Sequence, residues 1–170
     1  MAEFSPKFKE ALSLVQKPGR YTGGEPGCIY KDKSKVDVRM AFCFPDTYEI
    51  GMSFLGEKIL YDILNRHENW WCERAFMPWT DMKAQMERLD IPLYCLESKD
   101  PLTDFDIVGF SLEYELCYTN VLAMLRLSGI PLRAADRDER WPLIIAGGPC
   151  VCNAEPMADF FDVMQLGEGE

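Results

Sequence analysis

The sequence lacks the long apolar runs that membrane proteins carry. Its longest apolar stretches are short, such as residues 142–147, whereas a membrane span needs about 20 apolar residues. The N-terminus shows no apolar stretch of the secretory type, and repeats and low-complexity segments are absent. With 170 residues, of which 48% are hydrophobic and 27% charged, the composition excludes a disordered or fibrous chain and predicts an ordinary globular protein.

Positive charge is also scarce. The chain has 18 Lys and Arg against 28 Asp and Glu, for a formal net charge of −10, which disfavours tight binding to nucleic acid or to an anionic membrane. The imbalance is uneven, because residues 1–40 carry eight basic against five acidic side chains and residues 41–170 carry ten against twenty-three. We therefore expect a mildly basic N-terminal arm, an acidic body, and neither a membrane nor a nucleic-acid partner for this segment.

None of the seven cysteines forms a C-x-x-C pair. Their odd number and the absence of a secretory signal predict reduced, buried thiols in a cytoplasmic protein. Cys150 and Cys152 are the only close pair, and two thiols alone do not make a closed zinc site. We expect these two to be packed thiols and predict no metal site.

Apolar strands alternate with amphipathic helices along the chain. A helix over 4–16 opens an N-terminal helix and basic arm (residues 1–35), and the α/β domain occupies residues 36–170. The predicted strands are 36–44, 73–77, 105–112, 142–146 and 162–166, with a short edge strand at 92–96. The predicted helices are 54–66 (capped by Ser53), 80–89, 113–127 and 156–161. This alternation predicts a five-stranded parallel sheet, flavodoxin-like or Rossmann-like, with helices on both faces. Five parallel strands suggest the flavodoxin-like order 2-1-3-4-5, but the sequence alone does not fix the order.

The loops that follow the strands hold the candidate ligand-binding residues, because open parallel sheets bind ligands at the carboxyl ends of their strands. Glycine there lets a ligand approach the backbone closely. The same loops are turns that any α/β fold needs, so the pattern alone leaves both interpretations open. The candidates are Asp46, Tyr48 and Gly51 in the first predicted loop (residues 45–51), Ser111 and Leu112, Gly147 and Gly148, and Gly167.

Five stretches, at 20–25, 38–53, 105–125, 142–149 and 159–170, resemble in collinear order the N-terminal cobalamin-binding-like domain of radical SAM proteins. The resemblance implies an accessory domain that caps or positions substrate at a catalytic barrel. It also implies a partner, the C-terminal radical SAM domain of the same polypeptide, which would carry the 4Fe–4S cluster and S-adenosylmethionine. Cobalamin is the cofactor that the resemblance implies for the domain itself.

Cobalamin domains place an Asp-x-His-x-x-Gly motif after the first strand, and the resemblance aligns it with Asp46, Tyr48 and Gly51. Tyr48 replaces the histidine, and a phenol is a poor substitute for a neutral imidazole as a cobalt ligand. The only histidine, His67, follows the predicted helix 54–66. The resemblance therefore implies cobalamin binding without a protein ligand to cobalt. It matches Ser111 and Leu112 only loosely to the family's Ser-x-Leu segment, and Gly147 and Gly148 to a glycine pair beside which the nucleotide tail passes.

The C-x-x-x-C-x-x-C motif that holds a radical SAM cluster is absent, so we do not expect this chain to be catalytic alone. Two alternatives stay open. One is a non-catalytic docking module without a cofactor, which a closed crevice would favour. The other is a flavodoxin-like binder of flavin or nucleotide, although residues 45–50 lack the glycines of a phosphate-binding loop.

Overall fold

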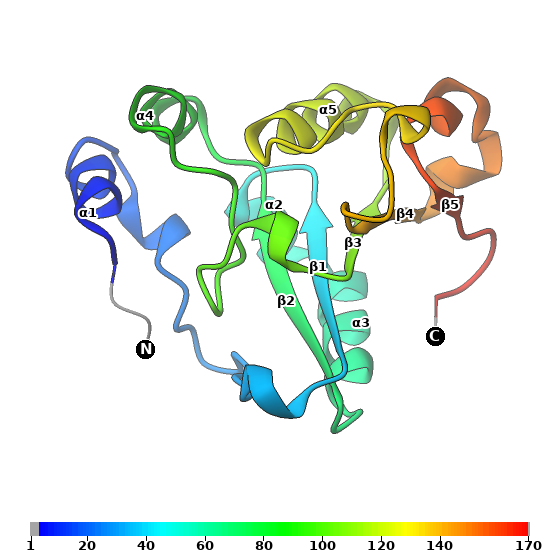
Figure 1. Ribbon diagram of the computed structural model, residues 1–170, viewed down its shortest axis with the longest axis horizontal. Coiled ribbons are helices and arrows are strands. Elements are labelled where there is room, and N and C mark those ends of the chain that lie inside the picture. Colours follow the sequence, from blue (N-terminus) through cyan, green and yellow to red (C-terminus); the bar gives the residue numbers. More distant parts are fainter. Residues whose placement is uncertain (1–3, 170) are drawn as a thin grey trace.

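The computed structural model describes residues 4–169. Residues 1–3, at the start of the predicted N-terminal region, and Glu170, at the end of the predicted α/β domain, lie outside the described residues. Five parallel strands form one sheet in the order β2-β1-β3-β4-β5 (Figure 1). The predicted parallel α/β fold is confirmed, and the strand order is the flavodoxin-like one that the sequence suggested without fixing. The strands are β1 (Val38–Phe44), β2 (Trp70–Phe76), β3 (Ile107–Ser111), β4 (Leu143–Gly147) and β5 (Val163–Met164).

Helices lie on both faces of this sheet. They are α1 (Pro6–Ser13), α2 (Tyr48–Ser53), α3 (Leu55–Asn65), α4 (Thr80–Leu89) and α5 (Tyr118–Leu127). Short 3-10 turns occur at Pro18–Tyr21, Lys33–Lys35, Leu102–Asp104, Glu115–Cys117, Ala134–Asp136, Pro149–Asn153 and Glu155–Phe160. No helix within residues 4–169 is long and apolar enough to cross a membrane.

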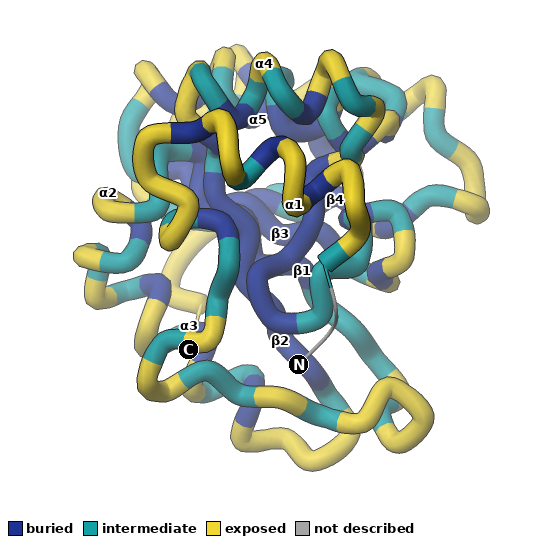
Figure 2. Tube along the Cα trace, turned by 90° about the vertical axis from the view of Figure 1, so that its left-hand side faces the viewer, coloured by how far each residue is buried: buried dark blue, intermediate teal, exposed yellow. Residues whose placement is uncertain are grey.

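The main core lies between the sheet and the layer of α1, α4 and α5. Alternate strand residues such as Cys43, Val108 and Ile144 point into it and meet Met82 of α4 and Met124 of α5. In Figure 2 the central strands β1, β2 and β3 accordingly run through the middle of the molecule mostly as buried tube. A smaller cluster on the opposite face joins Phe42 and Cys72 to Tyr61 of α3. Within residues 4–169, one face is thus covered by several helices and the other by α3 alone.

Two predictions about the first connection are wrong. Residues 45–51, predicted as a loop, contain the start of α2. Phe54, not Ser53, is the N-cap of α3, because Ser53 ends α2 and donates its hydroxyl to the carbonyl of Ile50 at 2.7 Å.

Other boundaries also differ from the prediction. Residues 92–96 do not form a strand, since the only bridge there joins Tyr94 to Pro101 in antiparallel fashion. Helix α1 ends at Ser13, and α5 begins only at Tyr118, because Glu115–Cys117 forms a 3-10 turn. The predicted helix 156–161 is likewise a 3-10 turn, the fifth strand has two residues, and β2 starts three residues earlier than predicted.

The N-terminal segment is attached to the β2 side of the sheet. Lys31 donates to the backbone carbonyls of Asn65, His67 and Trp70 at 2.8, 2.6 and 2.5 Å. The backbone N–H of Ile29 donates to the Tyr61 hydroxyl at 2.8 Å. These contacts hold residues 29–31 against α3 and the start of β2.

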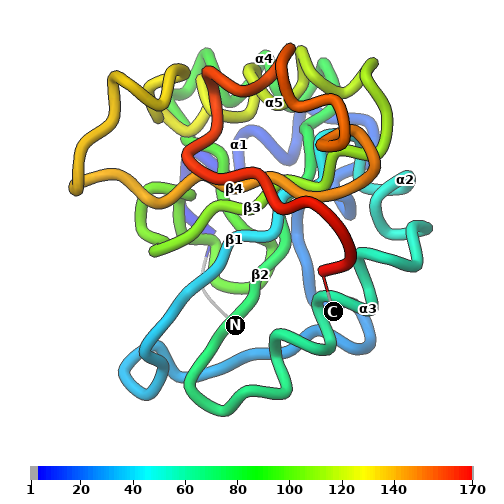
Figure 3. Tube along the Cα trace, turned by 90° about the vertical axis from the view of Figure 1, so that its right-hand side faces the viewer, coloured from blue at the N-terminus to red at the C-terminus, as the bar shows by residue number. Residues whose placement is uncertain are grey.

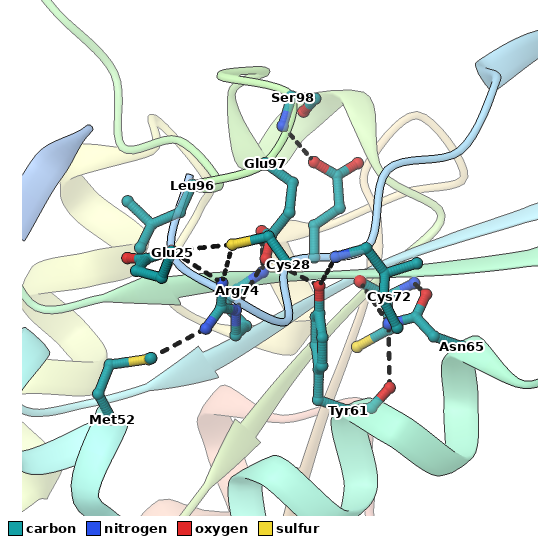
Figure 4. Close-up of polar contacts among 12 residues, drawn as sticks. Glu25, Cys28, Met52, Tyr61, Asn65, Cys72, Arg74, Leu96, Glu97 and Ser98 are labelled. Carbon is teal, nitrogen blue, oxygen red and sulfur yellow. Dashed lines mark hydrogen bonds and ion pairs between the residues drawn. The ribbon is translucent and has the colours of Figure 1, made fainter. Parts of the chain in front are cut away.

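Charged residues are buried beneath this segment (Figure 4). Arg74 of β2 donates its Nε to Glu97 at 2.7 Å, and Glu97 also accepts from the Arg74 backbone N–H at 2.8 Å. The other side of the guanidinium contacts Glu25 at 3.3 Å and the Cys28 sulfur at 3.0 Å. A buried charge needs such partners. Glu57 of α3 lacks hydrogen bonds of this kind: it is 1% exposed, and neither carboxyl oxygen has a hydrogen-bond partner.

Candidate functional site

The carboxyl ends of β1 and β3 form the topological switch point of the sheet, because the chain continues from β1 to one side and from β3 to the other. Asp46 follows β1 and accepts a hydrogen bond from the hydroxyl of Tyr114, which follows β3. Burial and this bond raise the pKa of the Tyr114 phenol. Asn120 of α5 donates to the carbonyl of Pro45 at 2.9 Å. Side chains therefore bridge the switch point itself.

An open groove of about 670 Å³ lies beside this bridge on the α3 face of the sheet. Its floor consists of Met40 and Phe42 of β1, Ile107 and Gly109 of β3, and Ile145 of β4. Phe54, Leu60 and Leu64 of the α3 region form one wall, and Ser111, Glu113, Gly147, Gly148 and Gly167 surround its mouth. The groove is therefore apolar along the sheet and polar where the strands end.

Glycine occurs at positions 147 and 148 of the mouth for two different physical reasons. A β-carbon at Gly147 would meet no atom within 4 Å, so the missing side chain leaves the mouth open. At Gly148, φ is +101°, and a β-carbon would lie 2.8 Å from the carbonyl oxygen of Leu112. Glycine is thus required at 148 by the backbone, whereas at 147 it leaves free space.

The ionisable side chains that line the groove are acidic. They are Glu113 and Glu168, and no Lys, Arg or His among the described residues lines it. Ser111 donates its hydroxyl to Glu113 at 2.5 Å, which fixes that carboxylate at the mouth. This arrangement suits a ligand with an apolar body that is neutral or carries positive charge, because an anionic group would find no side-chain cation in the groove.

The structure brings four of the predicted site residues together around the groove: Ser111, Gly147, Gly148 and Gly167. Asp46 instead accepts from Tyr114, and Leu112 is fully buried in the main core. A β-carbon at Gly51 would overlap the ring of Phe76, so this glycine is required by packing.

Tyr48 points away from the groove. Its hydroxyl donates to Glu25 at 2.6 Å and its ring packs edge-on against Phe76, with 5.5 Å between the ring centroids. Burial and the contact with Glu25 raise the pKa of Tyr48. Tyr48 lines a separate cavity of only about 20 Å³. His67 follows α3 and lies beside Trp70, at the opposite end of β2 from the mouth. Tyr48 therefore does not line the groove, and His67 lies beside Trp70, the groove-lining residue at the start of β2.

Sequence reasoning missed the floor residues and Glu113. Met40, Ile107 and Ile145 belong to apolar runs that are typical of strands buried on both faces, so nothing in the runs distinguishes an open face. Glu113 was predicted as the first residue of the helix 113–127, but α5 starts five residues later. Its position two residues after Ser111, at the end of β3, is the one signal that could have identified it.

The cysteines do not form a metal centre. Cys43, Cys72, Cys95 and Cys117 are buried, as predicted, but Cys152 is exposed, so its predicted packing is wrong. In the described part of the chain no three His, Cys, Asp or Glu side chains are grouped closely enough to hold a metal ion.

The fold and the groove define a parallel α/β domain with an open ligand-sized space at the carboxyl ends of its central strands. Residues 56–170 match the family described as "Radical SAM proteins, N-terminal", and the chain belongs to this family. The uncharacterized protein MJ0966 of Methanocaldococcus jannaschii is similar, with 28% identity over 137 residues. The match covers 80% of this chain and 25% of that protein, so the chain spans about a quarter of the curated relative that it matches.

Proposed function

We propose that this domain positions a ligand, the substrate or a corrinoid, at the mouth of a radical SAM catalytic domain in the same protein. The observation that carries the proposal is the groove, which opens at the carboxyl edge of the sheet between Ser111, Glu113 and Gly147. Parallel α/β domains hold ligands at this edge. Because the chain belongs to a family of N-terminal domains of radical SAM proteins, we expect such a ligand to face a radical SAM catalytic domain.

Exposed apolar side chains at the same edge support a facing domain. Leu55, Leu116 and Leu166 are exposed, and they lie in the segments that follow the carboxyl ends of β1, β3 and β5. Apolar side chains gathered at one edge are typical of an interaction surface. A catalytic domain packed there would close the mouth of the groove and exclude water from the ligand.

A corrinoid fits this site only without a protein ligand to cobalt. Tyr48 donates to Glu25 outside the groove, and His67 lies at the far end of β2. The groove would contact the apolar parts of the corrinoid, with Gly147 leaving room at the mouth. The role of this chain would therefore be to position the ligand.

The test compares full-length protein carrying Gly147→Leu with wild type. A leucine at 147 meets no atom near its β-carbon, so it should preserve the fold while filling the mouth. Gly19→Leu is the matched control, because its β-carbon also meets nothing within 4 Å and it lies far along the chain from the groove residues. Each protein is mixed with hydroxocobalamin, desalted and examined by visible spectroscopy, and co-purified ligands are identified by native mass spectrometry.

We expect Gly147→Leu, but not Gly19→Leu, to lose the ligand that the wild-type protein holds. A corrin spectrum that is present in the wild-type protein and in Gly19→Leu but absent in Gly147→Leu would identify that ligand as a corrinoid. If both variants hold the same ligands as wild type, the groove is not the site and the proposal fails. If the wild-type protein holds no ligand but the domain still packs against the catalytic domain, the docking-module alternative is favoured instead.

A further inference from the structure

Glu113 is a carboxylate at the mouth of the groove that no cation of the described chain balances. Among the described residues its only hydrogen bond is the one that it accepts from the Ser111 hydroxyl at 2.5 Å, and it forms no ion pair. Two other carboxylates at this edge of the sheet have such partners: Asp46 accepts from a tyrosine hydroxyl, and Glu49 pairs with two basic residues. An ionised carboxylate has about four acceptor positions, so Glu113 keeps most of them for a ligand.

The sheet fixes the position of this carboxylate. Ser111 is the last residue of β3 and is 8% exposed, so the packing of the strand holds its hydroxyl in place. Its partner on β4 is Gly147, where a β-carbon would meet no atom within 4 Å. The missing side chain leaves the pair of Ser111 and Glu113 uncovered on the β4 side. A ligand in the groove can therefore reach a carboxylate whose orientation is already set, which lowers the cost of binding.

The rest of the groove is apolar or negative. Its floor is formed by apolar side chains, which are those of Met40, Phe42, Ile107 and Ile145. Figure 3 shows the segment that follows β5 passing beside α3, and this segment adds Glu168, a second carboxylate, to the lining. The site thus combines an apolar floor with negative charge, and no lysine, arginine or histidine is found among its described lining residues.

We propose that Glu113 determines the specificity of the groove and selects a ligand that carries a protonated amine or guanidinium on an apolar body. A ligand that covers the mouth removes water from the carboxylate, and a buried charge without a partner is costly. A neutral ligand would leave Glu113 unpaired, whereas a cationic one forms a charge-assisted hydrogen bond. Ser111 is a positioning residue, because it acts on the ligand through Glu113. This inference rests on the proposed function, since it assigns the chemical class of the ligand of that same groove.

Binding of matched probes to the full-length protein tests the inference. Octylammonium, 1-octanol and octanoate share the same apolar chain and carry a positive, a neutral and a negative head group at neutral pH. Isothermal titration calorimetry measures their affinities at low salt, where charge is little screened. We expect octylammonium to bind at least about tenfold more tightly than octanol, because hydrogen bonds between charged groups are the stronger ones, and octanoate to bind least. Equal affinity for octylammonium and octanol would overturn the inference.

A pair of variants distinguishes Glu113 from the general negative charge of the chain. Glu113→Gln removes the carboxylate and keeps the shape of the side chain, whereas Glu115→Gln removes an exposed carboxylate nearby that does not line the groove. We expect Glu113→Gln to lower the affinity for octylammonium about tenfold and to leave that for octanol unchanged, and Glu115→Gln to change neither. If both variants lose octylammonium affinity equally, the net charge attracts the probe and the inference fails.

Variants of Ser111 test its positioning role. Ser111→Ala removes the hydroxyl that holds Glu113 at the mouth, and Ser111→Thr keeps a hydroxyl at the same position. The readout is the ratio of the affinities for octylammonium and octanol, which a general loss of packing would lower for both probes alike. We expect this ratio to fall in Ser111→Ala and to be retained in Ser111→Thr. An unchanged ratio in Ser111→Ala would overturn the role given to Ser111.

Gly147→Leu separates failure of this inference from failure of the proposed function. We expect it to abolish binding of octylammonium and of octanol, since it fills the mouth beside Ser111. If it blocks both probes but the wild-type protein binds them equally, the ligand site stands and selection by charge is wrong. If it leaves octylammonium binding unchanged, the probe binds elsewhere and both proposals fail. If the wild-type protein binds none of the probes, this inference fails, and binding of hydroxocobalamin would still support the proposed function.

Discussion

Glu57 should make the stability of this domain depend on pH in a direction opposite to that of most carboxylates. It is 1% exposed, and neither of its oxygens has a hydrogen-bond partner. Burial raises its pKa from 4.5 to about 8, and the charge of Arg74 offsets this only in part. Since the folded protein holds this proton more tightly than the unfolded chain does, the folded state binds more protons between these values, and its stability falls as the pH rises.

The magnitude follows from the two pKa values. At pH 7 the unfolded carboxyl group is ionised and the folded one is mainly protonated, so the group costs about 3 kcal/mol relative to pH below 4.5. Above pH 8 the cost levels off at about 5 kcal/mol. Glu57→Gln has nearly the same shape and cannot ionise. We expect the variant to match wild type near pH 4 and to be more stable by about 3 kcal/mol at pH 7.

Urea unfolding followed by circular dichroism between pH 4 and 9 measures this difference. Glu139→Gln is the control, because Glu139 lies exposed in the turn before β4, and its curve should run parallel to that of wild type. If the Glu57→Gln curve also runs parallel to wild type across this range, then Glu57 is ionised in the folded protein and the argument from burial is refuted.

Three further predictions concern backbone strain, buried charge and thiols. Gly148→Ala should destabilise more than Gly24→Ala by about 1 to 3 kcal/mol in urea unfolding, because both have positive φ but only the β-carbon at 148 meets backbone atoms. Equal costs would contradict this. Arg74→Met should cost about 3 to 5 kcal/mol by leaving a buried glutamate unpaired, whereas Arg88→Met breaks an exposed pair and should cost under about 1 kcal/mol. A thiol reagent should modify Cys152 first and the four buried cysteines only on unfolding, and early reaction of a buried thiol would indicate local opening.

The alternation of strands and helices was sufficient to predict the parallel sheet, whereas its strand order was suggested by analogy with flavodoxin-like folds and not fixed by the sequence. Apolar runs such as 105–112, separated by amphipathic helical segments, favour parallel strands joined by helical crossovers. The boundaries of helices were harder to predict, because local capping hydrogen bonds compete with the hydrophobic pattern. Ser53 resembles an N-cap in sequence, yet its hydroxyl bonds back to Ile50 and ends the preceding helix.

The candidate site was predictable only where it depends on strand ends. Ser111 and Gly147 are the last residues of the apolar strands β3 and β4 and therefore lie at one edge. The direction of Tyr48 was not predictable, since it depends on Glu25, which is 23 residues away in sequence and is brought close only by the fold. The same holds for Arg74, whose burial is explained by Glu97 and not by any feature of its own strand.

The position of β1 has a consequence for how this domain can be exchanged between proteins. It is the first strand in the chain, yet it pairs with both β2 and β3 and so joins the two parts of the sheet. The segment that matches the family begins at residue 56, after β1 has ended. A gene fusion that transferred only that segment would deliver β2 without a neighbouring strand. The evolutionary unit that can move and still fold must therefore begin before Val38.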